Sequence, residues 1–138
     1  MRNVVLTILL KDNKYVLQLR SNKVGIPHPG IWGLFGGQLE SGEKPITGIV
    51  REIKEELNVQ IPDEKFKVFT SFSEYHDFYK EEIHYHIFSA DFTDFWGKHE
   101  LLEGQGVDCF TFSELSQVKV PETIIRILKD FHNKNKKT

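Results

Sequence analysis

The chain has 138 residues, of which 39% are hydrophobic and 28% charged, and its formal net charge at pH 7 is −2. This composition predicts one globular domain over residues 1–138 and excludes a disordered chain. The small net charge and the lack of a long apolar run argue against binding to polymeric nucleic acid or to a membrane. The single cysteine, Cys109, cannot form an intrachain disulfide and suits a reducing compartment, so we expect a cytoplasmic protein.

The N-terminal part of the chain shows strand patterns interrupted by turns. Residues 4–10 are apolar and rich in β-formers, residues 11–14 carry a turn signal, and residues 15–20 alternate in polarity. This pattern predicts a β-hairpin. Glycine and proline indicate a loop over residues 21–31, and residues 32–39 are typical of a short strand or loop broken by glycine.

Residues 45–57 have the periodicity of an amphipathic helix. Pro45 suits the first helical position, where its missing N–H is not needed. Asn58 can adopt the left-handed conformation that often ends a helix. The apolar stripe that we expect to be buried consists of Ile46, Ile49, Val50, Ile53 and Leu57.

The second half of the chain again mixes strands with a helix. Residues 66–73 and 82–92 are predicted strands, joined by an acidic, aromatic loop. Residues 93–106 look irregular, residues 107–112 predict another strand, and residues 121–131 predict a terminal helix. Because helices separate groups of strands, we expect an α/β fold with a mixed sheet covered by helices.

The predicted helix over residues 45–57 carries three acids on one side. Glu52, Glu55 and Glu56 fall within an arc of about 100°, and the apolar stripe is centred roughly 120° away from them. One interpretation is a solvated acidic face, on which Arg51 offsets Glu55 by only about 0.2–0.5 kcal/mol. The other is a binding site for a hard cation, because Mg²⁺ prefers carboxylate oxygens and turns the repulsion into attraction.

The spacing in front of these acids favours the cation site. Two glycines precede the helix, and Glu43 lies just before its first residue. Five residues separate Gly37 from Glu43, and seven residues separate Glu43 from the segment over residues 51–59. This spacing resembles the signature of the Nudix hydrolases, G-x5-E-x7-R-E-U-x-E-E-x-G-U, where U is a bulky aliphatic residue. Eight of the nine specified positions match, namely Gly37, Glu43, Arg51, Glu52, Ile53, Glu55, Glu56 and Val59. The departure is Asn58, where the family has glycine, and asparagine also tolerates a left-handed turn.

The resemblance implies a Nudix α/β/α sandwich, with a mixed β-sheet between helices, and hydrolysis of a nucleoside diphosphate linked to another group. It implies metal binding by Glu52, Glu55 and Glu56, with the Gly37 carbonyl as a further ligand. The expected metal is Mg²⁺, with Mn²⁺ as an alternative. Glu43 is implied to pair with Arg51 and hold the loop against the helix. The resemblance leaves open whether Glu55 or Glu56 removes the proton of the attacking water.

Further candidates for the site lie outside the predicted helix. The stretch over residues 101–115 is similar to the segment after the metal site of MutT-type Nudix enzymes, which implies that Glu103 reaches the metal or acts as a base, with Glu100 as the fallback. Arg20 is a candidate for binding substrate phosphates. Gly36 and Gly37 allow the main chain to approach a ligand closely.

The substrate is less sharply indicated. MutT-type enzymes read a purine partly through an asparagine near the start of the last helix, and the matching position here is Pro121. Aromatic residues between positions 73 and 82 either stack on a base or pack on the domain or on a dimer partner. The leading hypothesis is hydrolysis of a nucleoside triphosphate, including modified or oxidised ones, to the monophosphate and pyrophosphate. The alternatives are hydrolysis of a nucleoside diphosphate sugar or dinucleotide, and a non-catalytic Nudix-fold binding module. The partner is a small-molecule nucleotide, and the chain is a monomer or a homodimer.

Overall fold

The computed structural model describes residues 2–20, 31–101 and 106–135. Two helices and seven strands, joined by three short 3₁₀ helices, make up the described part of the chain. In chain order the elements are β1 (Arg2–Lys11), β2 (Lys14–Leu19), β3 (Trp32–Gly33), β4 (Phe35–Gln38), α1 (Pro45–Leu57), η1 (Asp63–Lys65), β5 (Lys67–His76), β6 (Glu81–Asp91), η2 (Thr93–Phe95), β7 (Gly106–Phe110), η3 (Ser113–Gln117) and α2 (Glu122–Asn135).

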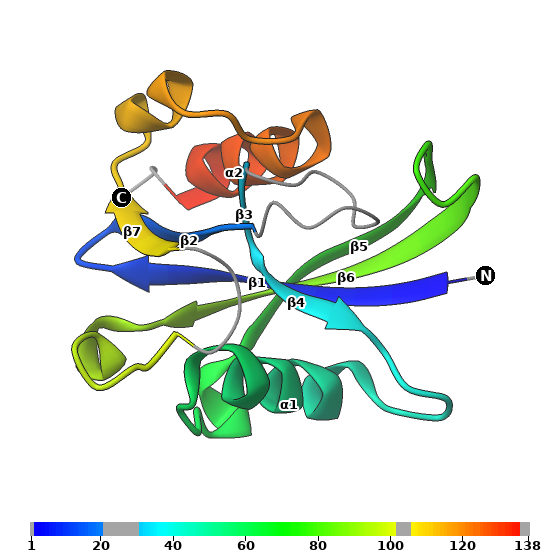
Figure 1. Cartoon of the computed structure of the whole chain (residues 1–138), viewed down its shortest axis with the longest axis horizontal. Helices are drawn as coiled ribbons and strands as arrows, with labels where there is room; N and C mark the ends of the chain where they lie inside the picture. The colour runs from blue at the N-terminus through cyan, green and yellow to red at the C-terminus, as the bar shows by residue number, and fades with distance from the viewer. Residues whose placement is uncertain (1, 21–30, 102–105, 136–138) are drawn as a thin grey trace.

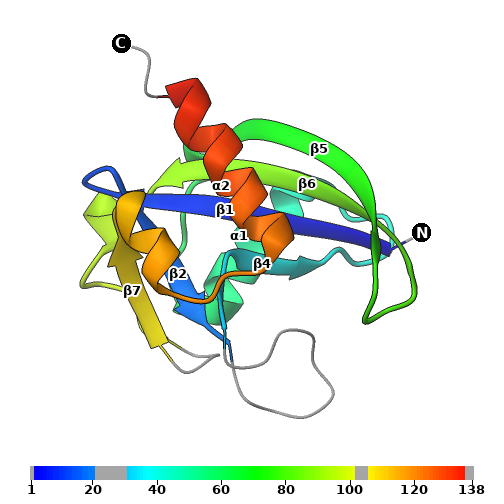
Figure 2. The same ribbon diagram turned by 90° about the horizontal axis from the view of Figure 1, so that it is seen from above.

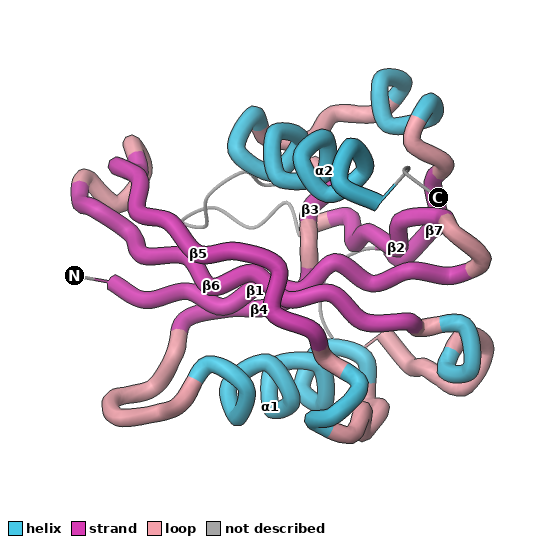
Figure 3. The backbone as a smooth tube through the Cα atoms, turned by 180° about the vertical axis from the view of Figure 1, so that it is seen from behind, coloured by secondary structure: helices cyan, strands magenta, loops and turns pink. Residues whose placement is uncertain are grey.

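The molecule has three layers, in which one sheet lies between two helices. Helix α1 covers one face of the sheet and helix α2 covers the other (Figures 1 and 3). The strand order is β3-β2-β1-β6-β5, with β4 paired to β1 and β7 paired to β2. Parallel and antiparallel pairs occur in the same sheet, so the expected mixed sheet between helices is confirmed.

Strand β1 is the centre of this sheet. Along one side it pairs in parallel with β6 from Arg2 to Leu10. Along its other side it pairs first with β4, over residues 4–7, and then with β2, over residues 9–11. Strands β4 and β2 therefore diverge at the middle of β1. The near-continuous apolar sequence of β1 suits this position, because a central strand is buried on both faces.

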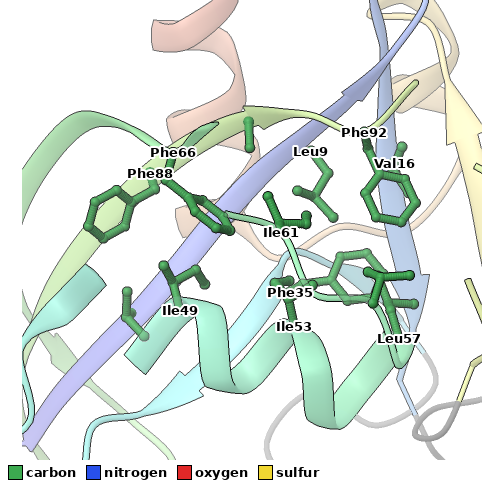
Figure 4. Packing of buried hydrophobic residues seen from close by; sticks show 13 residues of the cluster. Leu9, Val16, Phe35, Ile49, Ile53, Leu57, Ile61, Phe66, Phe88 and Phe92 are labelled. Atoms are coloured by element: carbon green, nitrogen blue, oxygen red, sulfur yellow. The ribbon is translucent and has the colours of Figure 1, made fainter. Parts of the chain in front are cut away.

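Two apolar clusters hold the layers together. The cluster on the α1 side joins Ile49, Ile53 and Leu57 of the helix to residues of the sheet such as Leu9 and Phe35 (Figure 4). The cluster on the α2 side joins the buried face of that helix, which crosses above β1 and β6 (Figure 2), to the opposite face of the sheet. Each face of the sheet therefore has its own core, which fixes the position of each helix.

Helix α1 begins and ends where its sequence predicts. Pro45 occupies the first turn, and Asn58 follows the helix in the left-handed conformation, with φ 54°. The Asn58 backbone N–H donates to the Lys54 carbonyl at 3.0 Å, which satisfies one of the last carbonyls of the helix. The hairpin between β1 and β2 is also confirmed, and both of its turn residues, Asp12 and Asn13, have positive φ.

Other boundaries differ from the prediction. Strands β5 and β6 extend to His76 and from Glu81, so only a four-residue turn remains of the predicted acidic, aromatic loop. The extra residues alternate between the two faces and pair across the hairpin although most are polar, which hides them from a search for apolar strands. Strand β7 ends at Phe110 instead of residue 112, because Thr111 and Glu114 bond to each other's backbone N–H groups and start η3.

Helix α2 runs from Glu122 to Asn135, four residues beyond its predicted end. The last turn is polar, so it adds nothing to the apolar periodicity that defined the prediction. The buried residues of this helix, Ile127, Leu128 and Phe131, lie within the predicted range. Neither helix of the described ranges combines the length and apolar character that a bilayer crossing would require.

Candidate functional site

A pocket of about 320 Å³ lies where strand β4 passes between the two helical layers. Such a volume is at the lower end of the range of small-molecule sites. The described residues that line it are Arg2, Val4, Leu6, Arg20, Gly33, Leu34, Gly36, Gly37, Gln38, Glu52, Glu56, His76, Tyr79, Ile83, Tyr85, Pro121, Thr123 and Ile124.

The pocket has an apolar part and an acidic part. Val4 and Leu6 of β1 and Ile83 and Tyr85 of β6 belong to the core on the α2 side, and they form the apolar part. The acidic part comes from helix α1 on the other face of the sheet, because Glu52 and Glu56 both reach the pocket. A ligand that combines a flat apolar group with a charged group suits this division.

The double glycine of β4 lies between these two parts and cannot be replaced without displacement. A Cβ at Gly36, where φ is +143°, would lie 2.0 Å from the Val5 carbonyl oxygen. A Cβ at Gly37 would lie 2.3 Å from Oε1 of Glu52. Both glycines line the pocket, so the main chain of β4 is open to a ligand on this side.

Glu56 is the most buried acid of α1, with 4% of its surface exposed. The backbone N–H of Gly36 donates to its Oε1 at 3.0 Å, and Nε2 of Gln18 donates to its Oε2 at 3.1 Å. These two donors come from β4 and β2, so the carboxylate connects the helix to both diverging strands. Buried carboxylates are held in this way because an unbonded one would be very unfavourable.

Glu52 and Glu55 have different surroundings. The side chain of Glu52 is 15% exposed and lies against Gly37, at the pocket. The side chain of Glu55 is 45% exposed, and both of its oxygens accept bonds from Nη1 of Arg51, at 2.9 and 3.1 Å. Glu55 is not among the described residues that line the pocket. The structure therefore brings Glu52 and Glu56 together and leaves Glu55 on the neighbouring side of the helix.

Arg51 and Glu43 form the pair that the sequence analysis expects. Nε of Arg51 donates to Oε2 of Glu43 and Nη2 to Oε1, each at 2.8 Å. Glu43 also accepts a bond from the backbone N–H of Glu40, and these interactions, chiefly that with Arg51, lower its pKa to about 2. The same Glu43 bonds raise the pKa of Arg51. Arg51 also donates to the Gln38 carbonyl, so it ties the loop before α1 to the helix.

The donor set at the acidic end of the pocket suits a divalent metal ion. Within the described ranges, no three histidine, cysteine or acidic side chains already converge on one point. Glu52 and Glu56 nevertheless adjoin one pocket beside the backbone of Gly37, and all of these groups offer oxygen. Mg²⁺ prefers such hard ligands and often needs only one or two carboxylates, since waters and substrate phosphates complete its shell.

The other predicted residues fall in three places. Arg20 lines the pocket. Glu103 lies outside the described residues. Glu100, its fallback, lies at the end of α1, where its backbone N–H donates to the Leu57 carbonyl and its carboxylate accepts a bond from Asn58. Glu100 is not among the described residues that line the pocket.

Some aromatic residues of the β5–β6 hairpin line the pocket and others do not. His76 and Tyr79 line the pocket, and burial lowers the pKa of His76. Tyr75 and Phe78 are about half exposed, at 55% and 49%. Pro121, the position at which MutT-type enzymes have asparagine, also lines the pocket.

Arg2 and Gln18 are polar residues at or beside the pocket that were not anticipated. Arg2 lines the pocket, stacks its guanidinium on the Tyr79 ring at 3.8 Å and donates to Gln38 and Glu81. Nothing local in the sequence marks it, since its three partners lie in β4, in the β5–β6 turn and in β6, all far along the chain. The sequence does carry a signal for Gln18, because the alternation of β2 places this polar residue on the same buried face as Val16.

Comparison with known proteins identifies the family. The NUDIX domain matches residues 1–131, almost the whole chain. The chain belongs to the NUDIX family. This membership confirms the prediction of a Nudix hydrolase that rests on the spacing from Gly37 to Val59. Within this family, NudI of Escherichia coli, a nucleoside triphosphatase, is 38% identical over 60 residues, which are 44% of this chain and 42% of NudI. The matched region therefore spans less than half of that relative.

Solved structures show the same Nudix fold. The MutT protein of Methanosarcina mazei superposes with a TM-score of 0.77 and 14% identity, over 99% of this chain and 96% of that chain. The NUDIX domain of Shewanella oneidensis NrtR, solved with ADP ribose, gives a TM-score of 0.77 and 16% identity, over 96% of this chain and 86% of that one. At these identities the likeness shows the fold alone, and it confirms the α/β/α sandwich.

Proposed function

We propose that this chain is a divalent-metal-dependent pyrophosphohydrolase that converts a nucleoside triphosphate to the monophosphate and pyrophosphate. The observation that carries the proposal is the divided pocket, in which the acidic pair Glu52 and Glu56 faces the same space as an apolar and aromatic surface. A nucleotide has a flat base that suits the apolar surface, and a polyanionic chain that a divalent ion would bridge to the acidic pair. The name of NudI, a nucleoside triphosphatase, favours a triphosphate over other nucleotides.

Each part of the site has a proposed role. Glu52, Glu56 and the carbonyl of Gly37 would hold Mg²⁺, or Mn²⁺ in its place, and the ion would supply charge neutralisation for the phosphates and activation of water. Arg20 binds substrate phosphates, and the main chain of Gly36 and Gly37 permits their close approach.

The acid that accepts the proton of the attacking water is Glu55 or Glu56. Glu55 takes part only when its carboxylate leaves Arg51, to which both of its oxygens are bonded. Arg51 and Glu43 keep the loop and helix in register. Glu103 stays a candidate metal ligand or base from its sequence context.

The test is hydrolysis of a panel of nucleoside triphosphates, oxidised triphosphates, nucleotide sugars and dinucleotides with Mg²⁺, with the products identified by chromatography. We expect a monophosphate and pyrophosphate from at least one triphosphate. Glu56→Gln should lower kcat by about 100-fold or more, because the metal loses a buried ligand. The matched control is Glu64→Gln, at an exposed residue of η1, which should keep wild-type activity.

Two other results of the substrate panel would favour the alternative functions. Cleavage of only nucleotide sugars or dinucleotides would replace the triphosphate with another diphosphate substrate for the same chemistry, and the NrtR domain with ADP ribose makes this the second candidate. Nucleotide binding without any hydrolysis would indicate a binding module.

A further inference from the structure

Gln18 is a buried polar residue next to Glu56 that no step of the proposed reaction uses. It lies in β2, where its neighbours Val16 and Leu17 are fully buried, and only 4% of its own surface is exposed. Burying an amide is unfavourable unless its groups are bonded, so an apolar residue would ordinarily be favoured here. The bonds that Gln18 makes therefore indicate what it does.

The Gln18 amide nitrogen has two acceptors. It donates to Oε2 of Glu56 at 3.1 Å and to the carbonyl of Leu34 at 3.3 Å. Reversing the amide would place its oxygen against two other oxygens, neither of which can donate. Only one orientation of the side chain fits, and in that orientation it points an N–H group at Glu56.

The consequence for Glu56 is a fixed carboxylate plane. Its Oε1 accepts the Gly36 N–H at 3.0 Å and its Oε2 accepts an N–H of Gln18 at 3.1 Å, so a donor from the sheet holds each oxygen. Two donors on different oxygens fix both the position and the rotation of the carboxylate group. Glu56 also lines the pocket, so the orientation of its carboxylate decides how it faces a metal ion there.

We propose that Gln18 is a positioning residue that holds the Glu56 carboxylate in the orientation required to bind a divalent metal ion. The inference rests on the proposed metal role of Glu56. Gln18 is not among the described residues that line the pocket, so it acts through Glu56 and not by touching the substrate. Residues that orient a metal ligand commonly change metal affinity or activity by about 10- to 100-fold when they are replaced.

Two substitutions remove the bond with little change of volume or chemistry. Gln18→Met keeps the unbranched shape without the donor, and Gln18→Asn keeps the amide but is one methylene too short to reach Glu56. The matched control is Thr7→Val in β1, another fully buried polar side chain, whose hydroxyl has no bonding partner within the described residues. Far-UV circular dichroism and thermal melting establish which variants are folded.

The first measurement is Mn²⁺ binding without nucleotide, followed by the electron paramagnetic resonance signal of free Mn²⁺. We expect Gln18→Met and Gln18→Asn to bind Mn²⁺ about tenfold or more weakly than the wild type. Thr7→Val should bind it as the wild type does. Unchanged affinity in either Gln18 variant that is folded would overturn the inference.

The second measurement separates positioning from a general structural role. With an active nucleotide substrate, kcat should fall by about 10- to 100-fold in the Gln18 variants, while KM stays close to that of the wild type. Raising the Mn²⁺ concentration should restore part of the rate. A rise in KM with unchanged kcat would contradict the inference.

The two proposals fail in different ways. A wild-type chain that binds Mn²⁺ and hydrolyses no nucleotide would overturn the proposed function, and the Mn²⁺ titration would still decide the role of Gln18. A wild-type chain that binds no Mn²⁺ would overturn the role of Gln18 and the metal-dependent mechanism with it.

Discussion

Glu43 and Arg51 form an ion pair with two hydrogen bonds, and its strength depends on pH. The pair lowers the pKa of Glu43 from an ordinary value of 4.5 to about 2. Because the pKa of the folded state is the lower one, the stabilisation is fully present above pH 4.5 and is lost as the pH falls from 4.5 towards 2. Two parallel bonds to a charged group also give the pair geometric specificity.

For this residue pair, we predict that Glu43→Gln lowers the free energy of unfolding by about 1.5–3 kcal/mol at pH 7, because a charge-assisted pair is lost. The difference between the variant and the wild type should shrink as the pH falls from 4.5 towards 2. Urea unfolding at several pH values measures it, with Glu64→Gln as the control. A difference that stays constant down to pH 2 would contradict this assignment.

The placement of several residues of the acidic helix could be predicted because it depends on spacing along one segment. The pair between Glu43 and Arg51 and the placement of Glu52 and Glu56 at a pocket follow from residues that are close in sequence. Arg2 could not be predicted in this way, since Tyr79 and Glu81 meet it only after the sheet has formed.

The end of helix α1 shows how a departure from the family pattern is tolerated. Asn58 has φ 54°, a conformation that asparagine adopts more readily than most residues. Its side chain also accepts a bond from Lys54 and donates one to Glu100. The helix therefore keeps its usual ending although the family glycine is absent.

The prediction for this element compares two substitutions at one position. Asn58→Ala should lower the free energy of unfolding by about 1 kcal/mol, because alanine is strained in the left-handed conformation. Asn58→Gly should not lower it by that much, because glycine adopts the conformation without strain and offsets the lost side-chain bonds. Thermal or urea unfolding of the three proteins measures the order. Equal effects of both substitutions would show that the side-chain bonds dominate.

Element boundaries could be predicted where an apolar pattern reaches the end of the element. Helix α1 is such a case, since its stripe runs from residue 46 to residue 57. The hairpin ends of β5 and β6 were missed because residues such as Glu74 and Glu81 continue the ladder with polar side chains. The reason for a glycine at position 48, inside α1, is also visible only in the structure, because a Cβ there would lie 2.3 Å from the Leu39 side chain. The close contact lies with the loop before the helix.

At the scale of the whole molecule, metal binding should stabilise the fold. A ligand that binds only the folded chain adds about 2.7 kcal/mol at a hundredfold excess over its Kd. We therefore predict that Mg²⁺ or Mn²⁺ raises the midpoint of thermal unfolding, and that a chelator reverses the rise. Glu52→Gln should reduce this rise and Glu64→Gln should leave it unchanged. Scanning fluorimetry measures it, and an equal rise in both variants would count against Glu52 as a ligand.

The layered architecture could be predicted from the alternation of strands and helices, but the pocket could not. Its apolar part comes from β1 and β6 and its acidic part from α1, on opposite faces of the sheet. The two parts meet only because β4 is a short strand with two glycines at its centre. No local sequence pattern shows that the apolar surface of β1 and β6 will adjoin the acids of α1 in one pocket.

The divergence of β2 and β4 at the middle of β1 has a consequence for how the protein inactivates. Gln18 on one of these strands and Gly36 on the other hold the same carboxylate, and both strands are bonded to β1. Separating them requires the innermost ladder of the sheet to open, which is the last part of such a fold to exchange its amide protons. Enzymatic activity should therefore be lost at the same denaturant concentration as the global unfolding transition, and not at a lower one.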